Sequence, residues 1–368
     1  MPKYTLLVGS RAFMAAAEAD MAKARRRLLV QAMTFEGDQA GLGVGRGVMA
    51  SAARDRRVLV DDYTRFAISD RFVFSHNLLD PDFRAELRAT RGMFDAMSSA
   101  GVGVRVTNPA GPLLVGFAFR NHKKLIVTDN AAYLGGINFS DHNFAWHDLM
   151  LRIEDAAVSD ALAADFDATW EGHGRSWSAE LGDIALYGLD GRDNHARFGE
   201  ILAAIDAAEH AIWVISPYLT FPFTDALARA AARGVAVTLI TPLDNNKPIV
   251  RDYILWFAAR SGLKVRLTRE MIHLKGLLID GRRLVLGSSN FDFVSYWIEE
   301  ELLGVVSNPA LIADFRRRVL EPLLAEALPE QAARPSPARG WRAAILLGAA
   351  GAVLGAGLPI PRTSVPWT

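Results

Sequence analysis

The stretch "NHKKLIVTDNAAYLGGIN", residues 121–138, decides the fold, because it directs polar and charged side chains toward the start of a buried strand. His122 and Lys124 are two residues apart, so on an extended backbone their side chains point to the same face, roughly 7 Å apart. The run from Leu125 to Val127 is the apolar core of a strand. An imidazole and a cation aimed together at the interior indicate a site rather than a simple core.

The same pattern returns in "MIHLKGLLIDGRRLVLGSSNFD", residues 271–292. Three residue types repeat at an interval of 151: His273 after His122, Lys275 after Lys124, and Asp280 after Asp129. An asparagine closes each copy, Asn138 in the first and Asn290 in the second, and the first turn is one residue shorter. One such motif would be weak evidence, but two copies with matching internal spacing indicate a duplication.

The flanking segments repeat as well. A helix followed by a buried strand is expected at residues 14–33 and again at 201–219. This order predicts an α/β fold with two lobes, each with a central mixed sheet flanked by helices. We expect an N-terminal lobe at residues 1–185, a C-terminal lobe at 186–328, and a linker with an apolar tail at 329–368.

Further elements are expected in the first half of the chain. The apolar run at 56–63 predicts a strand, residues 81–99 a helix and residues 101–108 a strand. The glycine-rich "GLGVGRG", residues 41–47, does not fit the G-x-G-x-x-G pattern because Arg46 occupies the third glycine position. We expect a flexible loop ahead of a helix there.

Composition limits the partners. Lysine plus arginine and aspartate plus glutamate both number 41, so no overall field attracts nucleic acid or anionic lipid, and anion binding must be local. The absence of cysteine excludes disulfides and thiolate metal sites. No histidine or carboxylate cluster has metal-ligand spacing, and we expect neither metal nor cofactor. The first twenty residues match a secretory signal poorly, which favours the cytoplasm or the cytoplasmic face of the inner membrane.

The duplicated motif resembles the signature of the phospholipase D superfamily, H-x-K-x4-D-x6-G-S-x-x-N or a close variant. Within that superfamily, "FRNHKKLIVTD" (119–129) and "GGIN" (135–138) are most similar to bacterial cardiolipin synthases and related phosphatidyltransferases. The first copy departs from the signature with glycine at 135 and 136, whereas the second keeps Gly287 and Ser288.

The resemblance implies that both motifs meet at the lobe interface and form one active site. It assigns His122 as the nucleophile that gives a phosphohistidine, and His273 as general acid and then base. A phosphodiester is anionic, so this chemistry needs charge neutralisation, a nucleophile and an acid for the leaving alkoxide. By resemblance, phosphate oxygens are bound by Lys124, Lys275, Asn138 and Asn290, with Ser288 near them.

The acidic residues have two implied roles. Asp129 and Asp280 lie at strand ends and are expected to make structural ion pairs, whereas Asp148 and Glu301 orient the imidazoles through the far ring nitrogen. Glu299 and Glu300 compete with Glu301 for this role, and Glu299 lies on the same strand face as Glu301. We prefer Glu301 because its strand aligns with that of Asp148.

We therefore expect an enzyme acting on glycerophospholipid phosphodiesters through a covalent phosphohistidine, with cardiolipin synthesis from phosphatidylglycerol as the first choice. The alternatives are a hydrolytic phospholipase D, a nuclease or other phosphodiesterase, and a catalytically inactive lipid-binding protein. Zero net charge argues against nucleic acid as a partner. We expect a phospholipid substrate, contact with a membrane surface, and a monomer because one chain carries both motifs.

The last residues change character. Residues 343–360 are eighteen uncharged, mostly apolar residues, at the lower edge of what spans a bilayer, and Gly351 and Gly355 have helix-packing spacing. They predict a membrane-associated tail, with a loose or protein-packed helix as the alternative. The six remaining histidines are expected to be surface or structural, with His147 the one to test because it precedes Asp148: His76, His142, His147, His173, His195 and His210.

Overall fold

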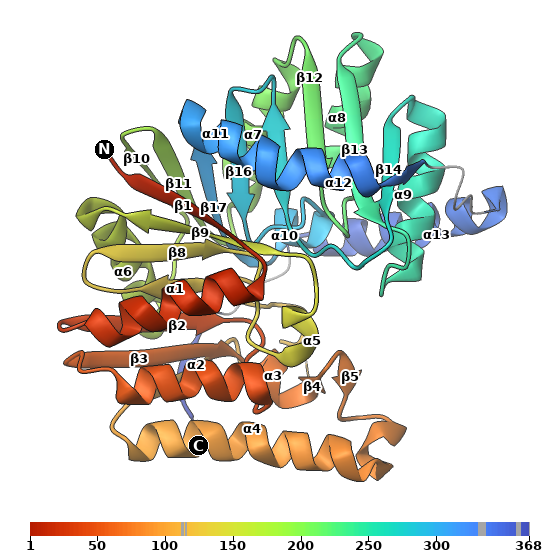
Figure 1. The fold of residues 1–368 in the computed structure, drawn as a ribbon. Helices are drawn as coiled ribbons and strands as arrows, with labels where there is room; N and C mark the ends of the chain where they lie inside the picture. The colour runs from red at the N-terminus through yellow and green to blue at the C-terminus, as the bar shows by residue number, and fades with distance from the viewer. Residues whose placement is uncertain (112–113, 115, 330–335, 358–361, 368) are drawn as a thin grey trace. The chain divides into compact units, whose positions relative to one another are not determined.

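The computed structural model describes residues 1–111, 114, 116–329, 336–357 and 362–367, and it divides into two units (Figure 1). The N-terminal unit comprises Met1–Ala145, Leu149–Arg175 and Ile360–Thr368, and the C-terminal unit comprises Trp146–Asp148 and Ser176–Pro359. The division after Arg175 lies ten residues before the predicted boundary at 185, because the strand that begins at Trp177 pairs within the second sheet.

The N-terminal unit is built on an eight-stranded mixed sheet in the order β1-β9-β8-β7-β2-β3-β6-β19. Its strands are β1 (Lys3–Val8), β2 (Arg27–Ala32), β3 (Asp55–Asp61), β6 (Gly103–Thr107), β7 (Leu125–Val127), β8 (Ala131–Gly135), β9 (Leu149–Glu154) and β19 (Ser364–Pro366). Strands β2, β3 and β6 run parallel, and the others pair antiparallel. A separate hairpin joins β4 (Ala67–Ile68) to β5 (Arg71–Phe72).

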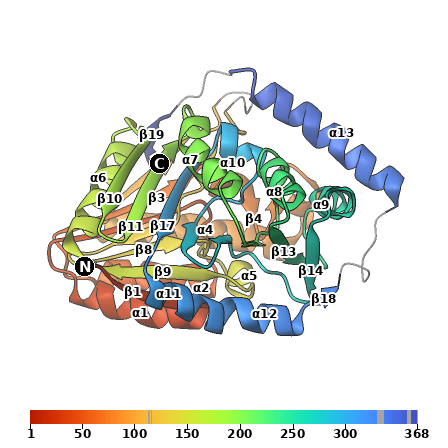
Figure 2. The same cartoon turned by 90° about the horizontal axis from the view of Figure 1, so that it is seen from above.

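Helices cover both faces of this sheet. Three helices share a core with one face: α1 (Ser10–Lys23), α2 (Gln39–Ala50) and α4 (Pro81–Ser99). Figure 2 shows α6 (Ala156–Trp170) on the other side. The short helices are α3 (Tyr63–Phe66), η1 (His76–Leu79) and α5 (Asp141–Phe144).

Helix α4 has the bounds predicted from the sequence. Pro81 occupies its first turn, and the Asp80 carboxylate accepts a hydrogen bond from the Asp82 N–H at 2.9 Å, which caps the helix. Phe83, Met93 and Met97 are buried along one side, at the spacing of an amphipathic helix. Local capping and apolar periodicity agree here, so the helix is predictable without its tertiary context.

The C-terminal unit contains a nine-stranded mixed sheet in the order β10-β11-β17-β16-β15-β12-β13-β14-β18. Its strands are β10 (Trp177–Leu181), β11 (Ile184–Asp190), β12 (Ala211–Ile215), β13 (Ala236–Pro242), β14 (Lys264–Thr268), β15 (Gly276–Ile279), β16 (Arg283–Gly287), β17 (Glu300–Val306) and β18 (Leu328–Pro329). Five helices share a core with one face: α7 (Asn194–Asp206), α8 (Phe223–Ala232), α9 (Pro248–Ser261), α10 (Phe293–Trp297) and α13 (Pro337–Leu354). The remaining helices, on the opposite side in Figure 2, are α11 (Pro309–Phe315), η3 (Arg316–Leu320) and α12 (Glu321–Glu326).

The two sheets repeat one topology. The order β1-β9-β8-β7-β2-β3-β6 in the first corresponds to β11-β17-β16-β15-β12-β13-β14 in the second. Every neighbouring pair has the same direction in both, with parallel pairing only at β2-β3-β6 and at β12-β13-β14. The duplicated α/β fold predicted from the motif spacing is confirmed.

The glycine-rich segment is not a loop, so that prediction is wrong. Residues 41–47 lie inside α2, which the Asp38 carboxylate caps by accepting from the Gly41 N–H at 3.0 Å. A Cβ atom on Gly41 would lie 1.8 Å from the Glu36 carbonyl oxygen, and one on Gly45 would lie 2.7 Å from a Met97 side-chain carbon. These glycines permit close packing, not flexibility.

The apolar tail forms α13, which packs on its own unit against α9. The two glycines of the predicted helix-pairing motif face aromatic rings, with Gly351 against Phe221 and Gly355 against Trp297. No helix in the described ranges combines the length and the apolar character needed to cross a membrane. Helix α13 thus packs on protein along one side, as the alternative reading of the sequence expected, while residues 358–360 of the predicted segment lie outside the described residues.

Candidate active site

Each motif is a hairpin whose two ends meet at one sheet edge. Strands β7 and β8 pair antiparallel with Leu125 opposite Leu134, and β15 and β16 pair with Gly276 opposite Leu286. The start of the first strand and the end of the second therefore lie side by side. The histidine and lysine precede the first strand and the asparagine follows the second, so all three gather at that edge, whereas the motif aspartate lies in the connecting turn at the far end.

The histidine and lysine of each copy are buried in extended backbone just ahead of the strand. The Lys124 ammonium donates a hydrogen bond to the His122 carbonyl at 2.6 Å, and His122 is 6% exposed. The Lys275 ammonium donates in the same way to the His273 carbonyl. Burying an ammonium group is costly unless an anion compensates it. Each copy thus places one buried cation next to its histidine, and a pair of such cations suits an anionic ligand.

The two motif asparagines are both buried but differ in their contacts. The Asn138 carbonyl oxygen accepts from the Thr34 N–H at 3.2 Å, and its amide donates to Asn143 at 3.4 Å. The side-chain oxygen of Asn290 has no hydrogen-bond partner among the described residues. Buried polar atoms are nearly always paired, so this oxygen marks a position that a ligand can satisfy.

Asp148 lies against the second histidine. The segment from Trp146 to Asp148 pairs with the chain before β15: the His147 N–H donates to the Met271 carbonyl at 3.0 Å, and the His273 N–H donates to the His147 carbonyl at 2.9 Å. This brings Asp148 Oδ2 to 2.7 Å from His273 Nδ1, with both side chains buried. The contact places the carboxylate on Nδ1, the arrangement by which an acid orients a catalytic imidazole. His147 contributes its backbone, and burial lowers the pKa of its side chain.

Two serine hydroxyls hold Glu301, the preferred one of the three competing acids. It is fully buried at the start of β17, accepts from the Ser295 hydroxyl at 2.6 Å, and also accepts from the Ser288 hydroxyl. Glu299 accepts from Ser295 at 3.3 Å, while Glu300 lies opposite Asp190 in the sheet. Ser288, which was expected near the phosphate, thus holds Glu301 within the C-terminal unit.

The motif aspartates bind the starts of strands through backbone N–H groups, which adds to the ion pairs expected of them. Each carboxylate accepts hydrogen bonds of 2.8–3.0 Å from three consecutive backbone N–H groups: Asp129 from Arg25, Arg26 and Arg27, and Asp280 from Glu209, His210 and Ala211. Burial alone would raise both pKa values, but these donors outweigh it and lower them. Asp129 also lies 3.9 Å from the Arg26 side chain, a weak addition. Their role is to fix the starts of β2 and β12.

A family model described as "Cardiolipin synthase, PLD-like domain" matches residues 18–170 and 201–321, a span that includes both motifs. The chain belongs to this PLD-like family. Among curated relatives, it is 28% identical over 252 residues to "Minor cardiolipin synthase ClsB" of Bacillus subtilis (strain 168), covering 59% of this chain and 60% of the relative. It is 26% identical over 306 residues to "Cardiolipin synthase B" of Shigella flexneri, covering 74% and 68% respectively.

Solved structures support the same PLD-like fold. A phosphatidylserine synthase from Haemophilus influenzae Rd KW20 superposes with a TM-score of 0.71 over 95% of this chain and 94% of that one, at 16% identity. A polyphosphate kinase from Porphyromonas gingivalis gives a TM-score of 0.58 over 94% of this chain and 53% of that one, at 12% identity. At such low identities these likenesses concern the fold alone.

Two buried ion pairs flank His122, and the sequence reasoning missed both. Asp61, at the end of β3, accepts from the Arg120 guanidinium and from the Asn121 N–H, each at 2.7 Å. Burial raises the pKa of Asp61 to about 6, although Arg120 opposes the shift. The Lys123 ammonium lies 2.8 Å from both oxygens of Asp165 on α6. A strand period of two places Lys123 on the face opposite His122, so a buried acid partner could have been expected.

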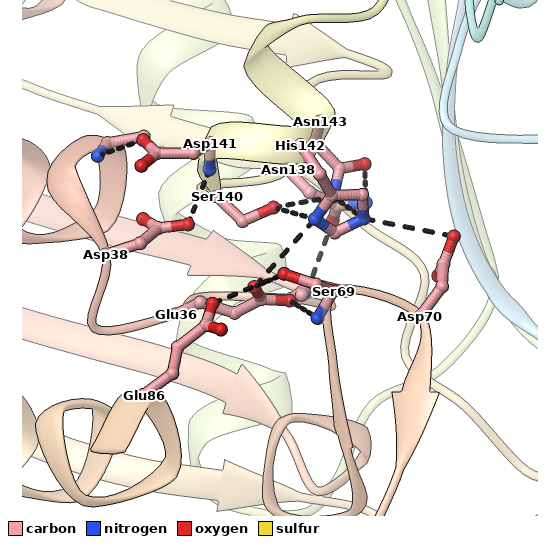
Figure 3. A network of polar contacts seen from close by, with 12 residues as sticks. Glu36, Asp38, Ser69, Asp70, Glu86, Asn138, Ser140, Asp141, His142 and Asn143 are labelled. Atoms are coloured by element: carbon pink, nitrogen blue, oxygen red, sulfur yellow. Dashed lines mark hydrogen bonds and ion pairs between the residues drawn. The ribbon is translucent and has the colours of Figure 1, made fainter. Parts of the chain in front are cut away.

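A carboxylate cluster, in which Glu36 is buried and Asp38 and Glu86 are half-buried, lies beside the PLD-like motif of the N-terminal unit (Figure 3). Glu36, Asp38 and Glu86 each place a carboxylate oxygen within 4.8 Å of the others. The Ser69 N–H donates to Glu36 at 3.1 Å, and His142 Nδ1 lies 3.8 Å from Glu36. Three such oxygens resemble the donor set of a hard cation. Burial, however, raises the pKa of Glu36 to about 8, so a proton relieves the repulsion at neutral pH.

This cluster connects to the motif asparagine. The Asn143 amide donates to Ser140 at 2.7 Å, lies 2.9 Å from His142 Nε2, and its carbonyl accepts from Asn138. Burial lowers the pKa of His142, which favours its neutral form. The expectation of a structural role for His142 agrees with these contacts, which hold the loop that carries Asn138.

Proposed function

We propose that the chain is a phosphatidyltransferase that acts on glycerophospholipid phosphodiesters, with cardiolipin synthesis from phosphatidylglycerol as its reaction. The observation that carries the proposal is the duplicated, buried pair of histidine and lysine at a sheet edge, with Asp148 on Nδ1 of His273. Two imidazoles and two ammonium groups are the set that phosphodiester exchange needs near neutral pH. The relatives named as cardiolipin synthases favour a lipid alcohol over water as the acceptor.

The first step of the proposed reaction forms a phosphohistidine. An imidazole nitrogen of His122 attacks phosphorus while the bond from phosphorus to the leaving glycerol oxygen breaks, and His273 Nε2 gives that oxygen its proton. Lys124 and Lys275 neutralise the equatorial oxygens as charge develops. The proposal requires both histidines to act on one phosphorus atom.

The second step transfers the group to an acceptor. His273 takes the proton from a glycerol hydroxyl of a second phosphatidylglycerol, and that oxygen attacks phosphorus and releases His122. Asp148 stabilises the imidazolium that His273 becomes, through the 2.7 Å contact at Nδ1. The products are cardiolipin and, from the first step, glycerol.

Product analysis tests this function. The purified chain is incubated with phosphatidylglycerol in a chelator, with single-stranded DNA in a parallel reaction, and products are identified by mass spectrometry. Cardiolipin with glycerol is the expected result, and the double variant His122→Ala/His273→Ala should abolish it while the exposed control His173→Ala does not. Phosphatidic acid as the main product would show that water is the acceptor, so the reaction would be hydrolysis and not transfer. Cleaved DNA without lipid turnover would overturn the proposal.

A further inference from the structure

Helix α13 of the C-terminal unit, labelled in Figure 2, carries apolar side chains on both its buried and its exposed side. Its inner side carries Gly340, Ala343, Leu347 and Gly351, all buried. Large apolar side chains on its outer side are exposed to solvent: Trp341 is 61% exposed, Ile345 48%, Leu346 46% and Val353 60%. A helix that is hydrophobic all round is normally covered on every side. The exposed outer face therefore indicates a surface that binds another molecule.

The charged side chains of α13 itself are of one sign. Residues 336–357 contain no acidic residue, and their two charged side chains, Arg339 and Arg342, are exposed within the first turns. A third cation joins them from α9, where Arg260 stacks on Trp256 at 5.2 Å, and Trp256 is the ring that Gly340 packs against. Cations clustered at one end of an apolar face complement anionic lipid headgroups.

We infer that the outer face of α13 docks on an anionic phospholipid bilayer, with the helix lying in the plane of the interface. Trp341, Ile345, Leu346 and Val353 would enter the boundary between headgroups and acyl chains, with the arginines among the headgroups. The small residues of the inner face hold the helix to the unit, so the helix lies on the membrane without crossing it. The inference deepens and rests on the proposed function, because a phosphatidyl donor is a component of the bilayer.

Vesicle flotation tests the inference, with vesicles of phosphatidylcholine mixed equally with phosphatidylglycerol. Wild-type chain should float with the vesicles, and Trp341→Gln/Ile345→Gln should lower the bound fraction at least about tenfold. The matched control Phe74→Gln/Leu79→Gln changes two side chains that are 66% and 79% exposed in the N-terminal unit, and it should float like wild type. Equal flotation of the α13 variant, or equal loss in the control, would overturn the inference.

The contribution of the arginines to binding of anionic lipid is tested with a separate pair of variants. Arg339→Gln/Arg342→Gln should weaken binding about fivefold per arginine at low salt. Arg88→Gln/Arg91→Gln, which removes the same charge from exposed positions on α4, should not. Association of the chain into dimers that Trp341→Gln/Ile345→Gln abolishes, with no flotation of wild type, would assign the face to a second copy and overturn the inference.

Activity measurements separate the two proposals. If the α13 variants lose turnover on vesicles but keep it on detergent-dispersed phosphatidylglycerol, both the docking face and the proposed function hold. Wild-type flotation that depends on α13 without turnover in either form would leave the docking inference standing and refute the proposed function.

Discussion

Replacing Asp148 by asparagine tests the geometry of the site most sharply within one unit. The Asp148 carboxylate lies 2.7 Å from Nδ1 of His273, and the two side chains are only 2% and 5% exposed, so water cannot take over as acceptor. An amide at this position can donate to Nδ1, which favours the wrong tautomer, and it lacks the charge that stabilises an imidazolium.

The expected loss follows from these contacts. Removing a group that only orients a histidine typically costs about 10–100-fold, and exchanging a carboxylate for an amide behind a catalytic imidazole can cost about 10⁴-fold. Because Asp148 is buried and charged, we expect kcat to fall about 10³-fold, or about 4 kcal/mol in the barrier, with KM nearly unchanged.

The assay is steady-state cardiolipin formation, with thermal unfolding measured in parallel. Asp148→Glu retains a carboxylate and should recover part of the loss, whereas the surface control Asp206→Asn, which breaks an exposed pair with Arg229, should change kcat little. A folded Asp148→Asn chain with kcat within about threefold of wild type would refute the reasoning that Asp148 supports proton transfer by His273.

Three further predictions concern stability. Asp280→Ala leaves three backbone N–H groups without their acceptor, so the free energy of unfolding should fall by about 2 kcal/mol or more in urea titration; an unchanged midpoint would contradict the capping role. Lys123→Ala removes the ammonium partner of the buried Asp165 carboxylate and should cost about 3–5 kcal/mol, whereas Lys123→Leu/Asp165→Leu should lie near wild type; equal losses would refute this. Burial raises the pKa of Glu36 from 4.5 to about 8, so the folded chain holds this proton more tightly than the unfolded chain. The free energy of unfolding should therefore fall between pH 4.5 and 8, by up to about 1.4 kcal/mol per pH unit, and Glu36→Gln should remove that part of the fall in urea titrations across this range; an identical pH slope in the variant would contradict it.

The duplicated fold was predictable because local signals and the repeat agree. Helix α4 follows from Asp80, Pro81 and apolar periodicity, and the hairpins follow from the two motifs. The glycines of α2 were misread because a close approach between Gly41 and the Glu36 carbonyl depends on tertiary packing, which composition does not reveal.

From the sequence, only those site residues were predictable that recur at the same spacing in both motifs. His122 and His273 stand out by repetition, but Asp61, Arg120 and Asp165 lie on separate elements and occur once. Lys123 has Leu274 as its counterpart in the second copy, so comparing the copies conceals its role. Contacts between segments distant in sequence, and the burial that shifts pKa values, arise only when the chain folds.

The tail shows how one property can favour two structures. Low charge and many small residues in α13 suit both a bilayer and close packing against rings such as Phe221 and Trp256. Hydrophobicity alone does not separate a spanning helix from a packed one, and it is the shape of the glycine-rich inner face that fixes this side of α13 to its own unit.

The central claim, phosphatidyl transfer by the two motif histidines, is tested most directly by mass analysis of chain quenched during turnover of phosphatidylglycerol. The account predicts a phosphatidyl adduct on the peptide that contains His122, absent from His122→Ala, which should also form no cardiolipin. An undiminished rate of cardiolipin formation by His122→Ala/His273→Ala, with no adduct on any histidine, would contradict it.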